Sequence, residues 1–170
     1  MLPGMLALAL AVAAAGDPVA FPGAAEAMDP TGRYTAVGAT SAGAHALSLK
    51  NLKTGASQSL QSYGRSAMVL WAPDGNALAI TDRASRDFST VKIFLSERPG
   101  APVDVGAELA RSFPSMPERT GNRRVYLEAV RWLDAKTLRF RLRGYGDRDP
   151  GGFDLLFDYA LGGDVRRARI

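Results

Sequence analysis

The feature that most constrains the fold of this chain is residues 71–80, a tight polar turn between two runs of strand-forming residues. Pro73 supplies the backbone φ that the second position of a type I turn needs, and Gly75 takes the positive φ that follows. Asp74, between them, can accept hydrogen bonds from nearby backbone N–H groups. Two short apolar runs joined by Pro-Asp-Gly predict a β-hairpin.

Weaker copies of this arrangement occur on both sides of it. Upstream, residues 29–37 carry a proline and a glycine at the matching positions, at a spacing of 43 residues. Downstream, residues 130–140 keep a tryptophan and an aspartate but lack the proline and the glycine. A period of about 40 to 45 residues with four short strands per unit is typical of the blades of a β-propeller.

The sequence WAPDGNALAI at residues 71–80 resembles the W-S-P-D-G-K-x-L-A-F signature of the WD-like repeats in TolB-type β-propellers. Residues 46–55 are similar to the strand and turn that usually precede the next signature in that family. The resemblance covers residues 29–95 well and 125–170 loosely. It implies a fold and is nearly silent on function, because propellers host many activities.

Three units are fewer than the four or more blades of a closed propeller. We therefore predict one all-β domain over residues 29–170, made of about three propeller-like stacked β-meanders in an open or incomplete ring. Residues 97–124 interrupt the repeat with an insertion that contains four prolines. Asp104 can cap a short helix in it, with Val105 and Leu109 on one face. Such an insertion can bind a partner or simply connect two units.

The third unit has the clearest strand alternation. Before the loop at residues 144–152, apolar side chains alternate with arginines, and after it they alternate with aspartates. Antiparallel pairing across this loop brings Arg143 to Asp154 and Arg139 to Asp158, and each pair contributes from a fraction of a kcal/mol to about 1 kcal/mol. The arginine row is thus first a paired sheet face and second a binding site. The two tryptophans occupy equivalent repeat positions, so we expect them in the core.

The N-terminus predicts export. Residues 1–16 have no charged side chain and are rich in leucine and alanine, as in the apolar core of a secretory signal peptide. The run is shorter than the roughly 20 residues that span a bilayer. We expect a periplasmic or secreted protein in which residues 17–28 form a linker. The basic segment that usually opens such a signal is missing, so an apolar first strand or helix stays open.

Composition narrows the classes of partner. The chain has no cysteine, which excludes disulfides, thiolate metal sites and a lipid-modified cysteine. The formal net charge is +4, yet no run of four or more Lys or Arg occurs, so nucleic acid is not the expected partner. A basic surface can instead face an acidic partner protein.

The sequence offers no catalytic motif. The single histidine, His45, lies in a strand-like run and is expected to be a half-buried strand residue. Neither a nucleophile motif nor a glycine-rich phosphate loop is present. Asp147, Asp149 and Asp154 weakly resemble a calcium loop but lack its further ligands. We therefore predict no catalytic residues, no metal and no cofactor, and keep a calcium-dependent enzyme that uses these carboxylates as the alternative.

The predicted function is protein binding without catalysis. Arginine and aromatic residues dominate binding hot spots, and the candidate partner-binding residues taken from the insertion and the following loop are Arg111, Phe113, Arg119, Tyr145 and Arg148. The expected partner is another cell-envelope protein, and one version is an inhibitor or immunity protein that blocks an envelope enzyme or toxin. A structural subunit that pairs its open edges with its own copies, a homo-oligomer, is a further alternative.

Overall fold

The computed structural model describes residues 16–114, 116, 124–147 and 149–168. In this part of the chain it contains thirteen β-strands and one short helix, α1, so the predicted all-β class is confirmed. The expected signal peptide, residues 1–16, lies outside the described residues except for Gly16.

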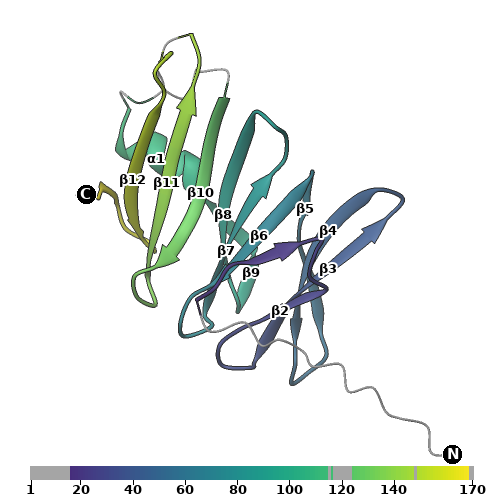
Figure 1. Cartoon of the computed structure of the whole chain (residues 1–170). Coiled ribbons are helices and arrows are strands. Elements are labelled where there is room, and N and C mark those ends of the chain that lie inside the picture. The colour runs from purple at the N-terminus through teal and green to yellow at the C-terminus, as the bar shows by residue number, and fades with distance from the viewer. Residues whose placement is uncertain (1–15, 115, 117–123, 148, 169–170) are drawn as a thin grey trace, which may run out of the picture.

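The strands form three units that follow one another along the chain (Figure 1). Unit 1 is an antiparallel sheet of β2 (Glu26–Met28), β3 (Tyr34–Ser41), β4 (Ala44–Asn51) and β5 (Ser57–Tyr63). Unit 2 contains β1 (Val19–Phe21), β6 (Ser66–Trp71), β7 (Ala77–Arg83), β8 (Phe88–Leu95) and β9 (Arg98–Asp104). Unit 3 contains β10 (Arg124–Trp132), β11 (Thr137–Tyr145), β12 (Phe153–Ala160) and β13 (Val165–Arg167).

Units 2 and 3 are parts of one continuous sheet. The start of β10 pairs in parallel with the start of β8, where Val125 lies opposite Phe88 and Tyr126 opposite Ser89. Further along β8, its edge is taken by β9 instead. The result is the predicted series of stacked meanders, with one parallel joint that the repeat pattern did not reveal.

The predicted hairpin turn at residues 71–80 is confirmed. Gly75 has φ +67°, and its N–H donates to the Ala72 carbonyl oxygen at 2.9 Å. The turn of the first repeat packs against it, because Arg33 donates to the Asp74 carbonyl oxygen and to Asn76 Oδ1, both at 2.8 Å. The repeated signature therefore links unit 1 to unit 2.

Two hydrophobic cores lie on the two faces of unit 2. On β7, Leu78 and Ile80 face the core shared with unit 1, while Ala77 and Ala79 face the core shared with unit 3, and all four are fully buried. Burial of a large apolar side chain stabilises a fold by about 1.5–3 kcal/mol. The central strand is thus covered on both faces, which fixes the stacking of the three units.

The two tryptophans take the structural role expected of them. Trp71 is buried in the core between units 1 and 2, and its indole N–H donates to the Ala27 carbonyl oxygen at 3.0 Å. Trp132 is half-buried against the other core, and its indole N–H donates to the Leu70 carbonyl oxygen at 3.0 Å. Each tryptophan therefore ties one unit to the next.

Residues 17–28 do not form the expected linker. They hold β1, which pairs with β6, and β2, which pairs with β3. Phe21 is 1% exposed, and its ring fills the space beside Gly38, where a Cβ atom would lie 2.6 Å from the ring. The proline, glycine and alanine content of this segment gave no sign of these two three-residue strands, which are stabilised by pairing with β6 and β3.

The segment from residue 97 differs in part from the expected insertion. Its first residues form β9, an edge strand that pairs with β8 and tolerates Pro99 and Pro102, since edge strands leave N–H positions unpaired. The helix follows as predicted: α1 (Val105–Ser112) is capped by Asp104, whose Oδ1 accepts from the Ala107 N–H at 3.1 Å. In the described part of the chain, no helix has the length and apolar content needed to cross a membrane.

Candidate functional site

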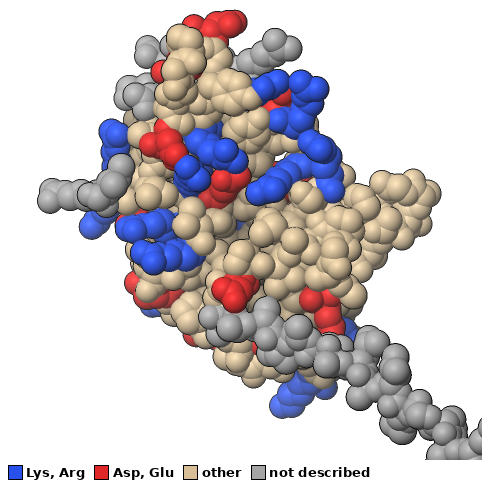
Figure 2. Space-filling view, viewed as in Figure 1, with Lys and Arg blue, Asp and Glu red and all other residues tan. Residues whose placement is uncertain are grey.

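A groove of about 580 Å³ crosses the region where the turns of unit 2 meet the first strands of unit 3. We call it the arginine groove, and its lining residues are Arg65, Ser66, Arg83, Ser85, Arg86, Phe88, Tyr126, Glu128, Arg143 and Tyr145. They include four arginines, three aromatic rings and a single carboxylate. Lys and Arg side chains gather over this part of the face (Figure 2).

The pairing of β10 with β11 forms two arginine–tyrosine pairs, and three of their four side chains, those of Tyr126, Arg143 and Tyr145, line the groove. Arg124 lies opposite Tyr145, and Tyr126 lies opposite Arg143. Each guanidinium carbon is 5.1 Å from the centre of the partner ring, a cation–π distance. Because side chains alternate along a strand, the other face of the same strands is free to form the apolar core. The sequence alternation of unit 3 therefore builds the groove wall and the core together.

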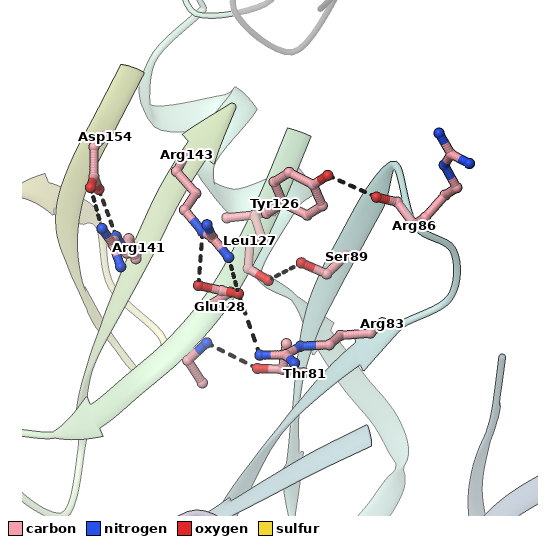
Figure 3. A network of polar contacts seen from close by, with 11 residues as sticks. Thr81, Arg83, Arg86, Ser89, Tyr126, Leu127, Glu128, Arg141, Arg143 and Asp154 are labelled. Carbon is pink, nitrogen blue, oxygen red and sulfur yellow. Dashed lines mark hydrogen bonds and ion pairs between the residues drawn. The ribbon is translucent and has the colours of Figure 1, made fainter. Parts of the chain in front are cut away.

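Glu128 lies at the centre of the polar network (Figure 3). Arg143 donates to both of its carboxylate oxygens, at 3.0 and 3.2 Å, and these bonds raise the pKa of Arg143. Arg83, from β7 in unit 2, places its Nη2 3.6 Å from the same carboxylate. A two-bond contact between arginine and a carboxylate is among the strongest polar contacts in proteins. Glu128 thus connects unit 2 and unit 3 across the groove.

The turn between β7 and β8 is held against β10. The Tyr126 hydroxyl donates to the Arg86 carbonyl oxygen at 2.7 Å, and the Ser89 hydroxyl donates to the Leu127 carbonyl oxygen at 2.7 Å (Figure 3). The rim of the groove is therefore fixed by hydrogen bonds, although it is formed by a turn.

The predicted ion pairs of unit 3 are confirmed in register and in part in contact. Arg139 donates to both oxygens of Asp158, at 2.8 and 2.9 Å. Arg143 and Asp154 are opposite each other as predicted, but they do not form the predicted pair. Arg141 binds Asp154 instead, and Arg143 forms its ion pair with Glu128 on β10. The bonds from Arg141 hold the pKa of Asp154 below its ordinary value.

A smaller groove of about 320 Å³ adjoins the first one and reaches β12. It shares Tyr126, Arg143 and Tyr145 with the arginine groove and reaches Asp154 at its far side. The two hollows therefore adjoin each other along β10 and β11.

The structure separates the residues that the sequence proposed as partner-binding. Tyr145 lies in the arginine groove and is 44% exposed. Phe113 ends α1 and packs edge-to-face on Phe157 at 5.4 Å, so its ring belongs to the core side of unit 3. Arg111 pairs with Glu108 on the same helix.

Two further predicted binding residues, Arg119 and Arg148, lie outside the described residues. Sequence reasoning missed Arg65, Arg83 and Arg86, which lie in or beside turns of unit 2. These arginines are close to unit 3 only in the folded chain, so sequence spacing gives no sign of the groove. The alternation of residues 124–128 was the one signal that could have pointed to it.

The carboxylates of the weak calcium motif do not gather. Asp154 is bound by Arg141, and within the described residues no cluster of three or more His, Asp or Glu side chains is arranged to hold a metal ion. His45 is half-buried on β4, stacked on Tyr63 at 5.1 Å, with Nδ1 2.8 Å from Thr40 Oγ1. It is the strand residue that the sequence predicted.

No protein-family model matches the sequence, and no curated protein is significantly similar to it. Among solved structures, an acylaminoacyl peptidase in complex with Z-Gly-Gly-Phe-chloromethyl ketone matches with 10% identity, 86% of this chain, 25% of that chain and a TM-score of 0.52. A prolyl endopeptidase matches with 14% identity, 88% of this chain, 22% of that chain and a TM-score of 0.50. TolB from Acinetobacter baumannii matches with 18% identity, 86% of this chain, 32% of that chain and a TM-score of 0.48.

The two peptidases have β-propeller domains, so the propeller-like class of fold is supported from structure as well as from the repeat signature. The chain spans no more than about a third of the length of each of the three solved structures. At such identities the likeness concerns the fold alone and carries no activity with it. A specific relation to TolB stays a prediction from the sequence.

Proposed function

We propose that this protein is a non-enzymatic binding module whose arginine groove engages another protein of the cell envelope. The observation that carries the proposal is the groove itself, where four arginines and three aromatic rings meet on neighbouring elements of units 2 and 3. Tyrosine and arginine are enriched at the energetic centres of protein interfaces. A basic groove also steers an acidic partner and speeds its association.

The rigidity of the groove supports the same proposal. Three of its lining residues, Tyr126, Arg143 and Tyr145, lie on adjacent, hydrogen-bonded strands, and its rim is held by the Tyr126 hydroxyl. A surface that is already ordered loses less conformational entropy on binding, which favours affinity. The groove therefore suits recognition of a partner better than a mobile loop of the same composition.

The envelope location within this proposal rests on the signal-like sequence of residues 1–16. In its most specific version, the protein is an inhibitor or immunity protein that covers an acidic surface of an envelope enzyme or toxin. A partner that is itself a hydrolase or a toxin would favour that version over a general scaffold.

The test is affinity capture from an envelope extract with the tagged chain and two charge-reversal variants. Arg65→Glu combined with Arg86→Glu alters the groove, whereas Lys53→Glu alters an exposed basic residue in the turn after β4 of unit 1. We expect the parent chain and Lys53→Glu to capture the same stoichiometric partner, and the groove variant to lose most of it. Equal capture by all three chains contradicts the proposal.

One observation favours a second candidate function, self-association as a structural subunit. β5 is a seven-residue strand that, among the described strands, pairs with β4 alone, and it contains no proline, glycine or charged residue. The other seven-residue edge strand, β9, is protected by two prolines and a glycine. Sedimentation of the chain across concentrations, with Ser59→Lys as the variant that blocks strand pairing, tests this candidate. If both chains sediment as monomers at every concentration, self-association is ruled out.

A further inference from the structure

We propose that Arg65 and Arg83 form a carboxylate-binding site within the arginine groove, which takes an Asp or Glu side chain of an extended partner segment. This inference rests on the proposed binding function and names the chemistry by which the partner is recognised. It also assigns Glu128 the role of an internal carboxylate that competes for Arg83.

The two arginines are neighbours at the point where β6 begins and β7 ends. Arg65 immediately precedes β6, and its N–H donates to the Arg83 carbonyl oxygen at 3.3 Å. Both side chains line the groove and both residues are exposed. Adjacent guanidinium groups repel each other weakly in water and therefore favour an anion placed between them. The antiparallel pairing of β6 with β7 thus brings the two residues together beside the groove that both line.

Neither arginine has its hydrogen-bonding capacity filled. Among the described residues, no carboxylate lies within 4.0 Å of the Arg65 guanidinium. Arg83 is 3.6 Å from Glu128, which is longer than a hydrogen bond, and its side chain is 52% exposed. A guanidinium group carries five N–H donors in a planar fork. Both forks are therefore open to a ligand.

The groove already contains an example of the contact that we propose. Arg143 holds both oxygens of Glu128, whose side chain is 17% exposed. Because Arg83 is 3.6 Å from Glu128, a ligand carboxylate beside Arg83 would be repelled by the negative charge of Glu128. Glu128 consequently limits the affinity of the site for anions, and neutralising it should strengthen ligand binding.

The neighbouring side chains indicate what else the ligand carries. Phe88 is 48% exposed and Tyr145 is 44% exposed, and both line the same groove. The Ser85 hydroxyl accepts from the Phe88 N–H at 3.2 Å, which orders the turn that presents the ring. In a ligand with an acidic residue next to an apolar one, the acidic residue can bind the two arginines while the apolar residue packs on the exposed ring of Phe88. A phosphate polymer, which carries a charge on every unit, would meet Glu128 as well as the arginines.

The probe is a fluorescent, amide-capped peptide of four glutamates and a phenylalanine, measured by anisotropy at low salt. Its control has glutamine in place of every glutamate. We expect the glutamate peptide to bind at least tenfold more tightly than the glutamine peptide. Arg65→Ala and Arg83→Ala should each weaken binding of the glutamate peptide by about threefold to tenfold. Lys53→Ala should leave it unchanged.

Glu128→Gln is the decisive variant, because the direction of its effect on peptide binding separates the two explanations. It should strengthen binding of the glutamate peptide by about twofold to fivefold, whereas a variant that merely damages the fold would weaken it. Circular dichroism of each variant shows whether the sheet is kept. Unchanged binding in both arginine variants, or weaker binding in Glu128→Gln, overturns the inference.

Two further outcomes separate this inference from the proposed function. If the charge-reversed groove loses its envelope partner but the peptide does not distinguish glutamate from glutamine, the groove binds a protein by other contacts and the carboxylate site is wrong. A single-stranded oligonucleotide that binds more tightly than the glutamate peptide also overturns the inference, since the preferred anion is then phosphate.

Discussion

At the scale of single residues, the turns of the first two repeat signatures pack so closely that Gly75 has no room for a side chain. Gly75 has φ +67°, and a Cβ atom there would lie 2.8 Å from Asp29 Oδ1. That carboxylate is not dispensable, because it accepts from the backbone N–H groups of Arg33 and Tyr34 in the first repeat. The glycine of one signature is thus required by the aspartate of the other.

We expect Gly75→Ala to destabilise the protein more than Gly55→Ala. Both glycines have positive φ, so each substitution costs about 1–2 kcal/mol for the left-handed backbone. Only Gly75 has a neighbour that the new methyl group would displace, whereas Gly55 has nothing within 4 Å. Urea unfolding of the two variants should differ by about 1 kcal/mol or more. Equal losses would show that the two signature turns do not support each other.

Asp82 predicts a pH dependence of stability. Burial raises its pKa, against the opposing effects of the Gly64 N–H and the charge of Lys92. A raised folded-state pKa means that Asp82 favours folding most below its unfolded pKa of about 3.9, and that this contribution is lost as the pH rises through the folded value. Asp82→Asn should therefore be more stable than the parent chain at pH 7.

Asp154→Asn is the matched control with the opposite sign. The bonds from Arg141 lower the pKa of Asp154, so its contribution is present above a pH of about 4 and is lost as the pH falls through the folded value. Thermal unfolding across pH should show Asp82→Asn gaining and Asp154→Asn losing stability at neutral pH, with both differences shrinking in acid. A stabilising Asp154→Asn at pH 7 contradicts the assignment of its ion pair.

At the scale of elements, α1 packs against the core with one face. Val105 and Leu109 are buried among residues of units 2 and 3, and the helix begins at the Asp104 cap. We expect Asp104→Ala to lower the free energy of unfolding by about 1 kcal/mol through loss of the cap. Leu109→Ala should lower it by about 2–5 kcal/mol through the cavity that it leaves.

The same two variants test the role of the helix in binding. Because α1 lies on the core side of unit 3, partner capture by the folded Asp104→Ala variant should equal that of the parent chain. A loss of capture with little loss of stability would return the interface to the segment that the sequence first indicated.

The elements that could be predicted from the sequence are those whose own residues specify them. The Pro-Asp-Gly turn, the helix cap and the alternation of β11 and β12 act over a few residues and were visible without the fold. The strands β1, β2 and β9 were missed, since they are short or proline-containing and are stabilised by the strand next to them. The arginine groove was missed for a related reason, since its side chains come from strands and turns that are far apart in the sequence.

At the scale of the whole molecule, the proposed binding groove contains four arginines and one carboxylate, so it is basic. The ion pairs within the chain are mostly at the surface. We expect capture of the envelope partner to weaken steadily as salt rises from about 0.05 M to 0.5 M, because added salt shortens the screening length and weakens the attraction between exposed charges. Stability of the isolated chain should change little over the same range, since exposed ion pairs contribute less than about 1 kcal/mol each. Salt-independent capture would point to an apolar interface elsewhere.

Hydrogen–deuterium exchange of the chain, with and without its captured partner, tests the arginine groove most directly. The account predicts slower exchange in the turn between β7 and β8, and in the ends of β10 and β11 that carry Tyr126 and Tyr145. It predicts no change in α1. Protection centred on α1, with the groove exchanging as before, would contradict the account and place the partner on the opposite side of unit 3.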